Sequence, residues 1–267
     1  MSTKIKRVGV LTSGGDAPGM NAAIRAVVRA CAYYNVECVG IYRGYQGMIE
    51  GDFKEMGPRD VKNIINKGGT ILKSARSADF RTAEGRKKAY DNLVAAGIDS
   101  FVVIGGDGSF TGAEIFNEEY GFPVIGIPGT IDNDIFGTSH TLGYDTALNT
   151  VIDAIDKIRD TANSHNRLFF VEVMGRDAGH IALNAGIGAG AEEILIPEED
   201  FGLERLVESL KRSKDSGKTS SIVVVSEGDK IGKNVFELKD YVEENMPEYD
   251  VRVSVLGHMQ RGGSPSC

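Results

Sequence analysis

The sequence predicts an α/β fold built on mostly parallel β-sheets that helices cover on both faces. Continuous apolar runs rich in β-branched residues recur along the chain, and stretches with helical periodicity lie between several of them. Strands buried on both faces read as near-continuous apolar runs, and the helices that connect parallel strands pack on those faces. The chain shows no low-complexity linker and no convincing internal repeat.

Each predicted strand is a short apolar run, and each predicted helix carries apolar residues at helical spacing. The predicted strands are residues 8–11, 38–42, 101–104, 124–127, 168–173, 194–196, 222–225 and 251–256. The predicted helices are residues 20–34, 82–96, 146–161 and 203–214, with a further helix after Ser109. A long helix follows the loops of the first half, so we expect a domain boundary near Gly143.

The composition narrows the class of protein. A chain of 267 residues is long enough for one large domain or two small ones. The hydrophobic content of 41% and the charged content of 25% are those of a soluble globular protein. The net charge of -8 argues against a nucleic-acid binder, which needs a basic face. Anionic small substrates remain possible, because local arginine clusters can override the global field.

The cysteines and the apolar runs indicate the cellular compartment of the protein. Cys31, Cys38 and Cys267 form no CxxC pair and have no metal-ligand spacing, so we interpret them as buried small hydrophobes plus a terminal thiol in a reducing compartment. The run at 8–11 is too short for a signal peptide, and no run approaches the length of a membrane span. We therefore expect a cytoplasmic protein with no membrane partner.

Glycine-rich loops follow three of the predicted strands. They read TSGGDAPGMN at 12–21, GGDGS at 105–109 and PGT at 128–130. In an open parallel sheet these strand ends share one edge, where ligands bind. Backbone N–H groups and helix N-termini gathered there suit phosphate, and glycine lets the backbone approach an anion closely. The alternative interpretation is a set of ordinary tight turns between strands and helices.

Three aspartates in these loops have the chemistry of a phosphoryl-transfer site. Asp107, flanked by glycines, is a natural Mg²⁺ ligand, because Mg²⁺ binds a few carboxylates and keeps phosphate and water oxygens. Asp132 and Asp134 are two residues apart in a turn, so one can face a substrate hydroxyl and the other the metal, with Thr130 hydrogen-bonding nearby. Alternatively, these carboxylates cap the turn that follows.

Arginines supply the cations that such a transfer needs, since guanidinium binds phosphate in a bidentate way. The candidates in or beside polar, glycine-rich segments are Arg76, Arg167, Arg176, Arg252 and Arg261. A single surface arginine is usually only solvated, so none of them carries the argument alone.

Two further glycine patterns are rejected as nucleotide sites. The segment Gly217-Lys-Thr219 lacks the earlier glycine of a P-loop, because Arg212 stands at that position, and it precedes a strand. The segment 186–191 matches a relaxed dinucleotide pattern, yet it also leads into a predicted strand.

Taken together, the motifs resemble the ATP-dependent 6-phosphofructokinases of the bacterial type. The resemblance extends from Val8 to Ser266. Its strongest segments are TSGGDAPGMN (12–21), GGDGS (105–109), PGTIDND (128–134), MGR (174–176) and GHMQRGGSP (257–265). A single GGDG occurs in other kinases, but this ordered set is highly specific.

The resemblance implies transfer of the ATP γ-phosphoryl group to the 1-hydroxyl of fructose 6-phosphate, giving fructose 1,6-bisphosphate in glycolysis. It implies two Rossmann-like three-layer domains with mostly parallel sheets and an active site in the cleft between them. The ATP- and Mg²⁺-binding domain would be residues 1–142, rejoined by 255–267, and the fructose 6-phosphate-binding domain residues 143–254. It also implies a homotetramer whose active sites are shared between subunits.

Matching positions receive their roles from the same resemblance. Asp132 is the general base, Asp107 binds Mg²⁺, and Asp134 assists the metal. The residues around the moving phosphoryl group are Gly15, Arg76, Thr130 and Arg176, and the remaining ATP contacts are Ser77, Gly106, Gly108 and Ser109. The sugar 6-phosphate is held by Arg167, Arg252, His258 and Arg261, and the sugar is contacted by Met174, Gly175 and Glu227. Arg167 and Arg252 come from a neighbouring subunit.

The family also has a nucleotide effector site between subunits. The matching phosphate-binding residues are Arg25, Arg29, Arg159 and Lys218, and Glu192 matches a position associated with effector-side Mg²⁺. Alternatively, the first two arginines are a basic pair on a solvated helix face. The Gly-Pro-Arg59 segment does not align cleanly with the next effector arginine of the family.

Two glycines bear on the phosphoryl donor. Pyrophosphate-dependent relatives carry Asp and Lys where this chain has Gly108 and Gly129, and those side chains take the room of the nucleotide α-phosphate, so ATP is favoured. Ser77 departs from the larger residue that relatives often have beside the nucleotide.

The competing hypotheses are a pyrophosphate-dependent or nucleotide-cofactor kinase and a non-catalytic nucleotide sensor. Full-length relatives continue past Cys267 with elements that cover the sheet, so we expect this chain to be C-terminally shortened.

Overall fold

The computed structural model describes residues 5–165, 167–199, 202–218, 220–228 and 234–267. The chain divides into two compact units. Unit 1 comprises Met1–Thr130, Ile135–Gly143 and Arg261–Cys267, and unit 2 comprises Ile131–Asp134 and Tyr144–Gln260. Relative to the expected domain ranges, residues 131–134 and 255–260 belong to unit 2 rather than to the first domain. The binding roles of the two units stay predictions.

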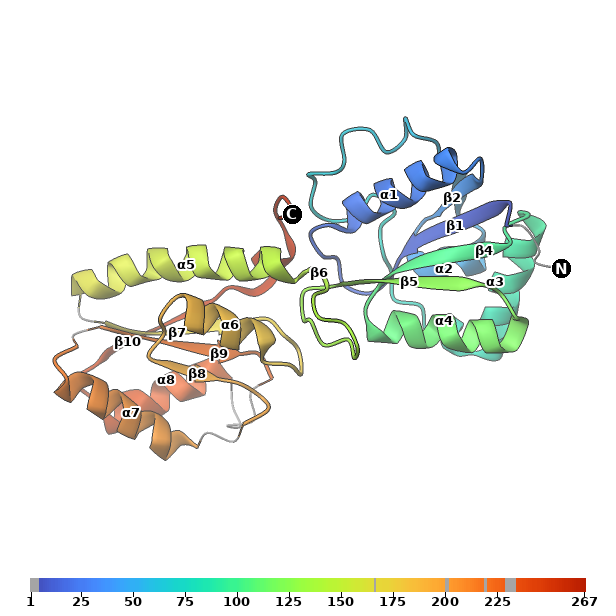
Figure 1. The fold of residues 1–267 in the computed structure, drawn as a ribbon. Coiled ribbons are helices and arrows are strands. Elements are labelled where there is room, and N and C mark those ends of the chain that lie inside the picture. Colours follow the sequence, from blue (N-terminus) through green and yellow to red (C-terminus); the bar gives the residue numbers. More distant parts are fainter. Residues whose placement is uncertain (1–4, 166, 200–201, 219, 229–233) are drawn as a thin grey trace. The chain divides into compact units, whose positions relative to one another are not determined.

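Unit 1 contains a six-stranded sheet in the order β3-β2-β1-β4-β5-β6 (Figure 1). The strands are β1 (Arg7–Thr12), β2 (Glu37–Ile41), β3 (Phe53–Glu55), β4 (Ser100–Gly105), β5 (Val124–Thr130) and β6 (Leu142–Gly143). Neighbouring strands are parallel except β3, which pairs antiparallel with β2. Because β1, β4 and β5 are adjacent, the carboxyl ends of three parallel strands lie at one edge of the sheet.

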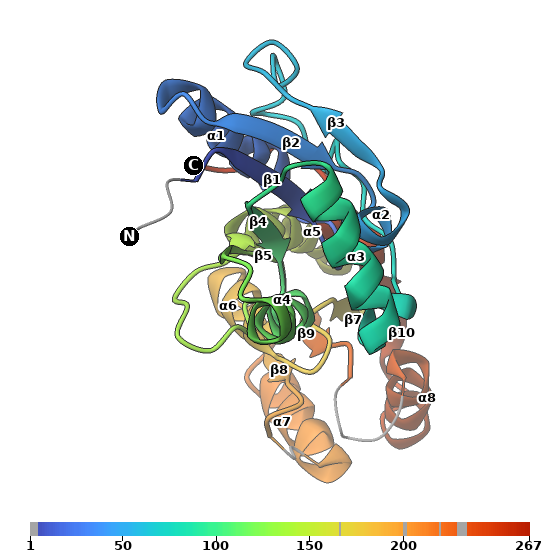
Figure 2. The ribbon, with the colours of Figure 1, turned by 90° about the vertical axis from the view of Figure 1, so that its right-hand side faces the viewer.

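Helices cover both faces of this sheet. They are α1 (Met20–Tyr33), α2 (Gly44–Glu50), α3 (Ala83–Ala95) and α4 (Asp107–Tyr120), with the 3-10 helix η1 (Asp79–Arg81) before α3. Figures 1 and 2 show α1 on one face and α3 and α4 on the other. On α1, the residues Ile24, Val28 and Cys31 form the buried stripe that an amphipathic helix turns toward a sheet.

The core of unit 1 centres on Phe116 of α4, which is fully buried. Its ring lies 5.8 Å from that of Phe101 on β4 and 5.7 Å from that of Phe122, in edge-on arrangements that aromatic pairs prefer. The ring of Phe80, from η1, lies 5.8 Å from Phe116 on another side. This aromatic cluster therefore joins the sheet, α4 and the turn before α3.

Unit 2 contains a four-stranded parallel sheet in the order β10-β7-β9-β8. Its strands are β7 (Arg167–Val173), β8 (Glu193–Leu195), β9 (Ser221–Ser226) and β10 (Asp250–Val255). The helices α7 (Leu203–Asp215) and α8 (Val235–Asn245) pack on one face, and α5 (Tyr144–His165) and α6 (His180–Gly188) lie on the other (Figure 1). The 3-10 helix η2 (Gly257–Arg261) follows β10.

The α/β fold class predicted from the sequence is confirmed. Each predicted strand and helix is present, and the helix expected after Ser109 begins already at Asp107. The elements that were not predicted are α2, β3, β6, α6, α8 and the 3-10 helices η1 and η2. Glycine-rich α2 and α6 lack a clear apolar period, and β3 is a short polar edge strand. The segment 186–191 leads from the end of α6 into β8, as predicted.

The described residues also bear on the cysteines and on membrane insertion. Cys31 and Cys38 are buried and Cys267 is exposed, as predicted. Among the helices of the described segments, none is both long enough and apolar enough to cross a bilayer.

Replacing Phe116 by alanine should strongly destabilise unit 1. The change empties the centre of the aromatic cluster, and such truncations cost about 3–5 kcal/mol. The matched control is Phe136→Ala in the same unit, where the side chain is fully exposed, so a change within about 0.5 kcal/mol is expected. Urea unfolding compares the two, and equal shifts of the midpoint would contradict the assignment of the core.

Candidate active site

The glycine-rich loops of unit 1 begin at one edge of its sheet. Thr12, the last residue of β1, pairs with Ile104 of β4, and Gly105 of β4 pairs with Pro128 of β5. The N–H of Ser13 donates to the carbonyl oxygen of Ile104 at 2.9 Å, which ties the first loop to the second. The segments that the sequence predicted to converge are therefore neighbours, but residues 128–130 are the end of β5 rather than a loop that follows the strand.

Close backbone approach explains the glycine at position 105. A Cβ there would lie 2.6 Å from the backbone oxygen of Ser13 and 2.7 Å from the hydroxyl of Ser109. Gly108 is different, because a Cβ at that position would have no atom within 4 Å. Gly105 is thus required by packing within the protein, whereas Gly108 opens onto unfilled space beside the loop.

Asp107 lies exposed in the first turn of α4, with Gly106 as the N-cap in extended conformation. The positive end of the helix dipole favours anions at this position. Across the described segments, no group of three or more His, Cys, Asp or Glu side chains is placed to hold a metal ion. Mg²⁺ nevertheless fits the Asp107 carboxylate, because it binds in many sites through one or two carboxylates plus substrate phosphates.

Arg261 lies directly over Gly15. A Cβ on Gly15 would be 2.6 Å from Nη1 of Arg261, so a side chain there would displace the guanidinium. The same Nη1 donates to the carbonyl oxygen of Asp16 at 3.2 Å. Arg261 was predicted to hold the sugar 6-phosphate and Gly15 to surround the moving phosphoryl group, and in unit 1 the two are in contact.

Buried polar residues of β1 and α1 anchor the loop that carries Arg76, a function that sequence reasoning missed. The Thr12 hydroxyl donates to the carbonyl oxygen of Lys73 at 3.0 Å. The Asn21 side chain donates to the carbonyl oxygen of Gly68 at 3.0 Å and accepts from the N–H of Ile71 at 2.8 Å. Both residues lie inside the TSGGDAPGMN motif, which was the available signal.

The predicted nucleotide residues of this loop differ in environment. Arg76 is exposed, while Ser77 is half-buried. The Ser77 hydroxyl donates to the side-chain oxygen of Gln46 on α2 at 2.8 Å and accepts from the N–H of Phe80 at 3.3 Å. Ser77 therefore fixes the turn between the loop and η1.

Asp132 and Asp134 lie in different environments, as a division of labour requires. Asp132 is buried and Asp134 is exposed, with Asn133 between them in the left-handed region at φ 54. Thr130, which ends β5, is also buried, and its carbonyl oxygen accepts a hydrogen bond of 2.6 Å from the Thr141 hydroxyl. The turn thus presents one sheltered and one solvated carboxylate.

Several predicted sugar-binding residues lie at the carboxyl edge of the unit 2 sheet. Met174 follows β7, Glu227 follows β9 and His258 follows β10, and these three strands are adjacent. Oε1 of Glu227 accepts from the N–H groups of Gly175 at 3.3 Å and Arg176 at 3.0 Å. The structure therefore brings Met174, Gly175, Arg176 and Glu227 together.

A second carboxyl group, that of Glu172 on β7, lies near this edge. Burial raises the pKa of Glu172, and the negative charge of Glu227 raises it further.

Arg167 and Arg252 lie at the other end of the same sheet. Arg167 opens β7, whose last residue, Val173, is six residues further on and hence about 20 Å away at the usual rise of a strand. Nε of Arg167 and Nη2 of Arg252 bond the two oxygens of Asp250 at 2.6 and 2.7 Å. The hydrogen bond from Arg167 chiefly lowers the pKa of Asp250. Within one chain, these arginines are therefore separated from Met174 and Glu227.

The predicted effector residues are partly engaged inside the protein. Nη1 of Arg25 donates to the carbonyl oxygen of Val61 at 2.9 Å, and Arg29 lies exposed one turn further along α1. In unit 2, Nη2 of Arg159 donates to the carbonyl oxygens of Ala189 and Gly190 at 2.5 and 3.1 Å. These bonds anchor α5 to the end of α6.

Glu192 and Lys218 form an ion pair of 3.1 Å. The Glu192 side chain is only 7% exposed, and its second oxygen accepts from the N–H of Ile222 at 2.5 Å. Both of its oxygens therefore serve the structure of unit 2, which weakens the expectation that Glu192 is a metal ligand.

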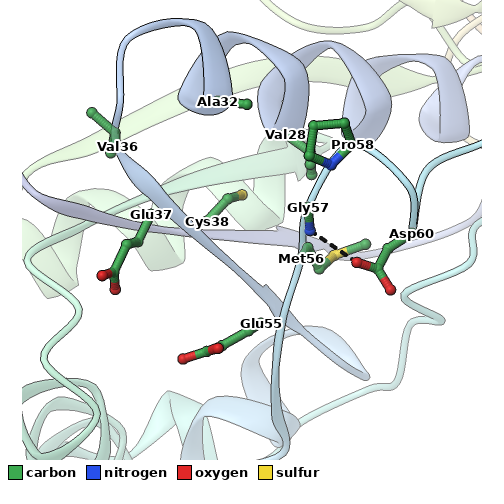
Figure 3. A pocket seen from close by; sticks show the side chains of 10 residues that line it. All are labelled: Val28, Ala32, Val36, Glu37, Cys38, Glu55, Met56, Gly57, Pro58 and Asp60. Atoms are coloured by element: carbon green, nitrogen blue, oxygen red, sulfur yellow. Dashed lines mark hydrogen bonds between the residues drawn. The ribbon is translucent and has the colours of Figure 1, made fainter.

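A separate pocket of ≈ 470 Å³ lies in unit 1 beside the end of α1 (Figure 3). Its walls combine apolar side chains, including Val28 and Met56, with the carboxylates of Glu37, Glu55 and Asp60. Glu37 and Glu55 both pair with Arg7. None of the predicted site residues lines this pocket.

Comparisons with known proteins give one family. The model of the family described as phosphofructokinase matches residues 7–267. An ATP-dependent 6-phosphofructokinase 2 of Bacteroides thetaiotaomicron is 58% identical over 98% of this chain and 80% of its own length. An ATP-dependent 6-phosphofructokinase 1 of Thermus thermophilus is also 58% identical, over 98% of this chain and 81% of its own length.

Solved structures agree with this assignment. The phosphofructokinase of Saccharomyces cerevisiae superimposes with a TM-score of 0.91 at 38% identity, over 97% of this chain and 39% of that one. A pyrophosphate-dependent phosphofructokinase of Marinobacter aquaeolei gives a TM-score of 0.82 at 24% identity, over 96% of this chain and 69% of that one, and shows the shared fold alone.

Alanine at the two glycines of the GGDGS loop should have opposite effects. Gly105→Ala places a Cβ against the Ser13 backbone and should destabilise the protein by about 1–3 kcal/mol through forced backbone shifts. Gly108→Ala, in a helical turn with open space, should be neutral or stabilise by up to about 1 kcal/mol. Thermal unfolding of the matched pair measures this, and equal losses would rule out the close approach.

Proposed function

Because this chain belongs to the phosphofructokinase family, we propose that it transfers the γ-phosphoryl group of ATP to the 1-hydroxyl of fructose 6-phosphate. The products are fructose 1,6-bisphosphate and ADP, and the reaction belongs to glycolysis. The observation that carries the proposal is the family match over residues 7–267, with relatives of 58% identity that are ATP-dependent 6-phosphofructokinases.

Unit 1 is proposed to bind the triphosphate. The adjacent loops after β1 and β4 offer backbone N–H groups and the N-terminus of α4, which suit anions. Close contact between these loops at Gly105 holds them in place before the nucleotide binds. Binding therefore costs little additional conformational entropy. The proposed groups around the moving phosphoryl group are Gly15, Arg76 and Thr130 of unit 1 and Arg176 of unit 2. Arg261 keeps its proposed role in holding the sugar 6-phosphate.

Asp132 is proposed as the general base. Its carboxylate takes the proton of the 1-hydroxyl, the alkoxide oxygen forms a bond to the γ-phosphorus, and the bond from that phosphorus to the β–γ bridging oxygen breaks to release ADP. Burial supports this role, since a base sheltered from bulk water holds its orientation toward the hydroxyl.

Mg²⁺ is proposed to bind Asp107, assisted by Asp134, and bound there it would neutralise charge on the phosphates. Both carboxylates are exposed, so they are open to a hydrated cation. The cytoplasm is the proposed location of the protein.

In unit 2, the proposed contacts to the sugar phosphate are Met174, Gly175, Glu227 and His258. Arg167 and Arg252 lie at the opposite end of that sheet, so we propose that they serve the site of a neighbouring subunit. This arrangement requires an oligomer, and a homotetramer is proposed. A nucleotide effector is proposed at Arg25, Arg29, Arg159, Glu192 and Lys218. To bind it, Arg25, Arg159 and Glu192 would have to exchange internal hydrogen bonds for bonds to the effector.

A pyrophosphate-dependent kinase is the second candidate, because a protein of that kind shares the fold. Gly108, where a side chain would enter open space, favours ATP. A Cβ on Gly129 would instead lie 3.0 Å from buried Ile104, so packing explains that glycine and it does not bear on the donor as expected from the sequence. A coupled assay of fructose 6-phosphate with ATP or with pyrophosphate distinguishes the candidates. We expect turnover when ATP is the donor and none when pyrophosphate is. The opposite result would reverse the donor assignment. No turnover with either donor would favour a nucleotide sensor.

Asp132→Asn should lower kcat about 10²–10⁴-fold, the usual contribution of a general base, while the KM values for both substrates change little. The loss corresponds to about 3–5 kcal/mol in the activation barrier. Asp153→Asn, the same chemical change on the exposed face of α5, is the control and should keep wild-type kinetics. Near-normal turnover of Asp132→Asn would refute the base assignment.

Gly108→Asp should raise the KM for ATP about tenfold or more without loss of folding, because the added carboxylate enters open space and repels the nucleotide phosphates. Gly108→Asn has nearly the same size without the charge and should raise it less. Steady-state kinetics with varied ATP measure both variants, and an unchanged KM in Gly108→Asp would mean that the space beside residue 108 is not used by the nucleotide.

A further inference from the structure

Gln260 is a buried polar residue with no role in the site described so far. It lies on η2, and its side chain is completely buried. Its Oε1 accepts from the N–H of Met174 at 3.2 Å, and its Nε2 donates to the carbonyl oxygen of Gly257 at 2.9 Å. The amide group thus bonds two backbone segments that are far apart in the sequence and both belong to unit 2.

The loop that Gln260 contacts is held through consecutive backbone N–H groups. Gln260 bonds the N–H of Met174, and Glu227 bonds those of Gly175 and Arg176. Arg176 has a φ of 57, a conformation that costs energy for a residue other than glycine. Gly175 is fixed as well, because a Cβ there would lie 2.3 Å from the backbone oxygen of Ala178. An unfavourable backbone shape of this kind persists only where its surroundings enforce it.

The second bond of Gln260 fixes the turn that carries His258. Gly257 is the first residue of η2 and has a φ of 49, in the left-handed region that favours glycine. By bonding the Gly257 carbonyl from within the same turn, the Gln260 amide closes η2 on itself. The same amide therefore links the turn that contains His258 to the backbone of Met174.

We propose that Gln260 is a positioning residue for sugar phosphate binding, which holds the Met174–Arg176 loop in register with the His258 turn. This inference rests on the proposed function. Gln260 does not touch the substrate in this proposal; it acts through Met174 and His258. A methionine of similar length would fill the same volume but could neither accept from Met174 nor donate to Gly257, so the amide chemistry and not the packing is what the proposal requires.

The test uses the whole chain with Gln260→Met, Gln260→Glu and a control, Met259→Ala, which changes an exposed neighbour on η2. Gln260→Met is expected to raise the KM for fructose 6-phosphate about tenfold while the KM for ATP stays within about twofold. Gln260→Glu keeps the oxygen that accepts from the N–H of Met174, so its KM for fructose 6-phosphate should lie between those of the wild type and Gln260→Met. Met259→Ala should match the wild type. An unchanged KM for fructose 6-phosphate in Gln260→Met, or a parallel rise in both KM values, would overturn the proposal.

If Gln260→Met does not fold, Gln260→Glu decides alone. The ionised carboxylate of this variant has no donor for the Gly257 carbonyl, so near pH 8 the KM for fructose 6-phosphate should exceed that of the wild type. Protonation of the carboxylate supplies an O–H donor, so the KM of the variant should approach the wild-type value as the pH is lowered. A KM equal to the wild type at all pH values would overturn the proposal.

A binding readout separates this inference from the proposed function. Thermal protection of the wild type by fructose 6-phosphate, without ATP, should be reduced in Gln260→Met and retained in Met259→Ala. Absence of protection and of turnover in the wild type would sink the proposed function itself. Protection in the wild type that is equal in Gln260→Met would sink the positioning role alone.

Discussion

The close approach of two backbones at Gly105 is the constraint on which the edge of unit 1 depends. No side chain fits between the end of β4 and the loop after β1, because the Ser13 oxygen would lie 2.6 Å from a Cβ. The hydrogen bond from Ser13 to Ile104 keeps the two segments at that separation. Since α4 starts immediately after this contact, its N-terminus lies next to the first loop, an arrangement that suits the proposed binding of an anion.

Unit 2 organises the corresponding edge of its sheet by a different means. There the N–H groups after β7 are bonded by side chains of the protein itself, Glu227 and Gln260. The proposed sugar contacts are thus arranged by a network that spans three strands. A polar network that is satisfied at every member specifies one geometry, because any displacement would leave a buried donor or acceptor without its partner.

The sequence was sufficient for the fold class and for the strand-end loops, because apolar runs and glycine-rich turns are local patterns. It also supplied the site list, since ordered motifs such as GGDGS and PGTIDND are specific to a family. It could not supply contacts between distant segments. The bond of Thr12 to Lys73, the guanidinium of Arg261 over Gly15 and the amide of Gln260 at Met174 join residues that no local pattern pairs. Short elements such as β3 and glycine-rich α2 were missed because tertiary packing rather than periodicity stabilises them.

Asp250 has a consequence for which anions can reach the two guanidinium groups that it joins. Arg167 and Arg252 project from neighbouring strands, and the carboxylate between them offsets their mutual repulsion. An incoming anion must compete with this built-in counterion. In the proposed role of the two arginines, a doubly charged anion is attracted more strongly than a singly charged one such as chloride. We therefore expect Asp250 to make the pair respond less to monovalent salt than to dianions.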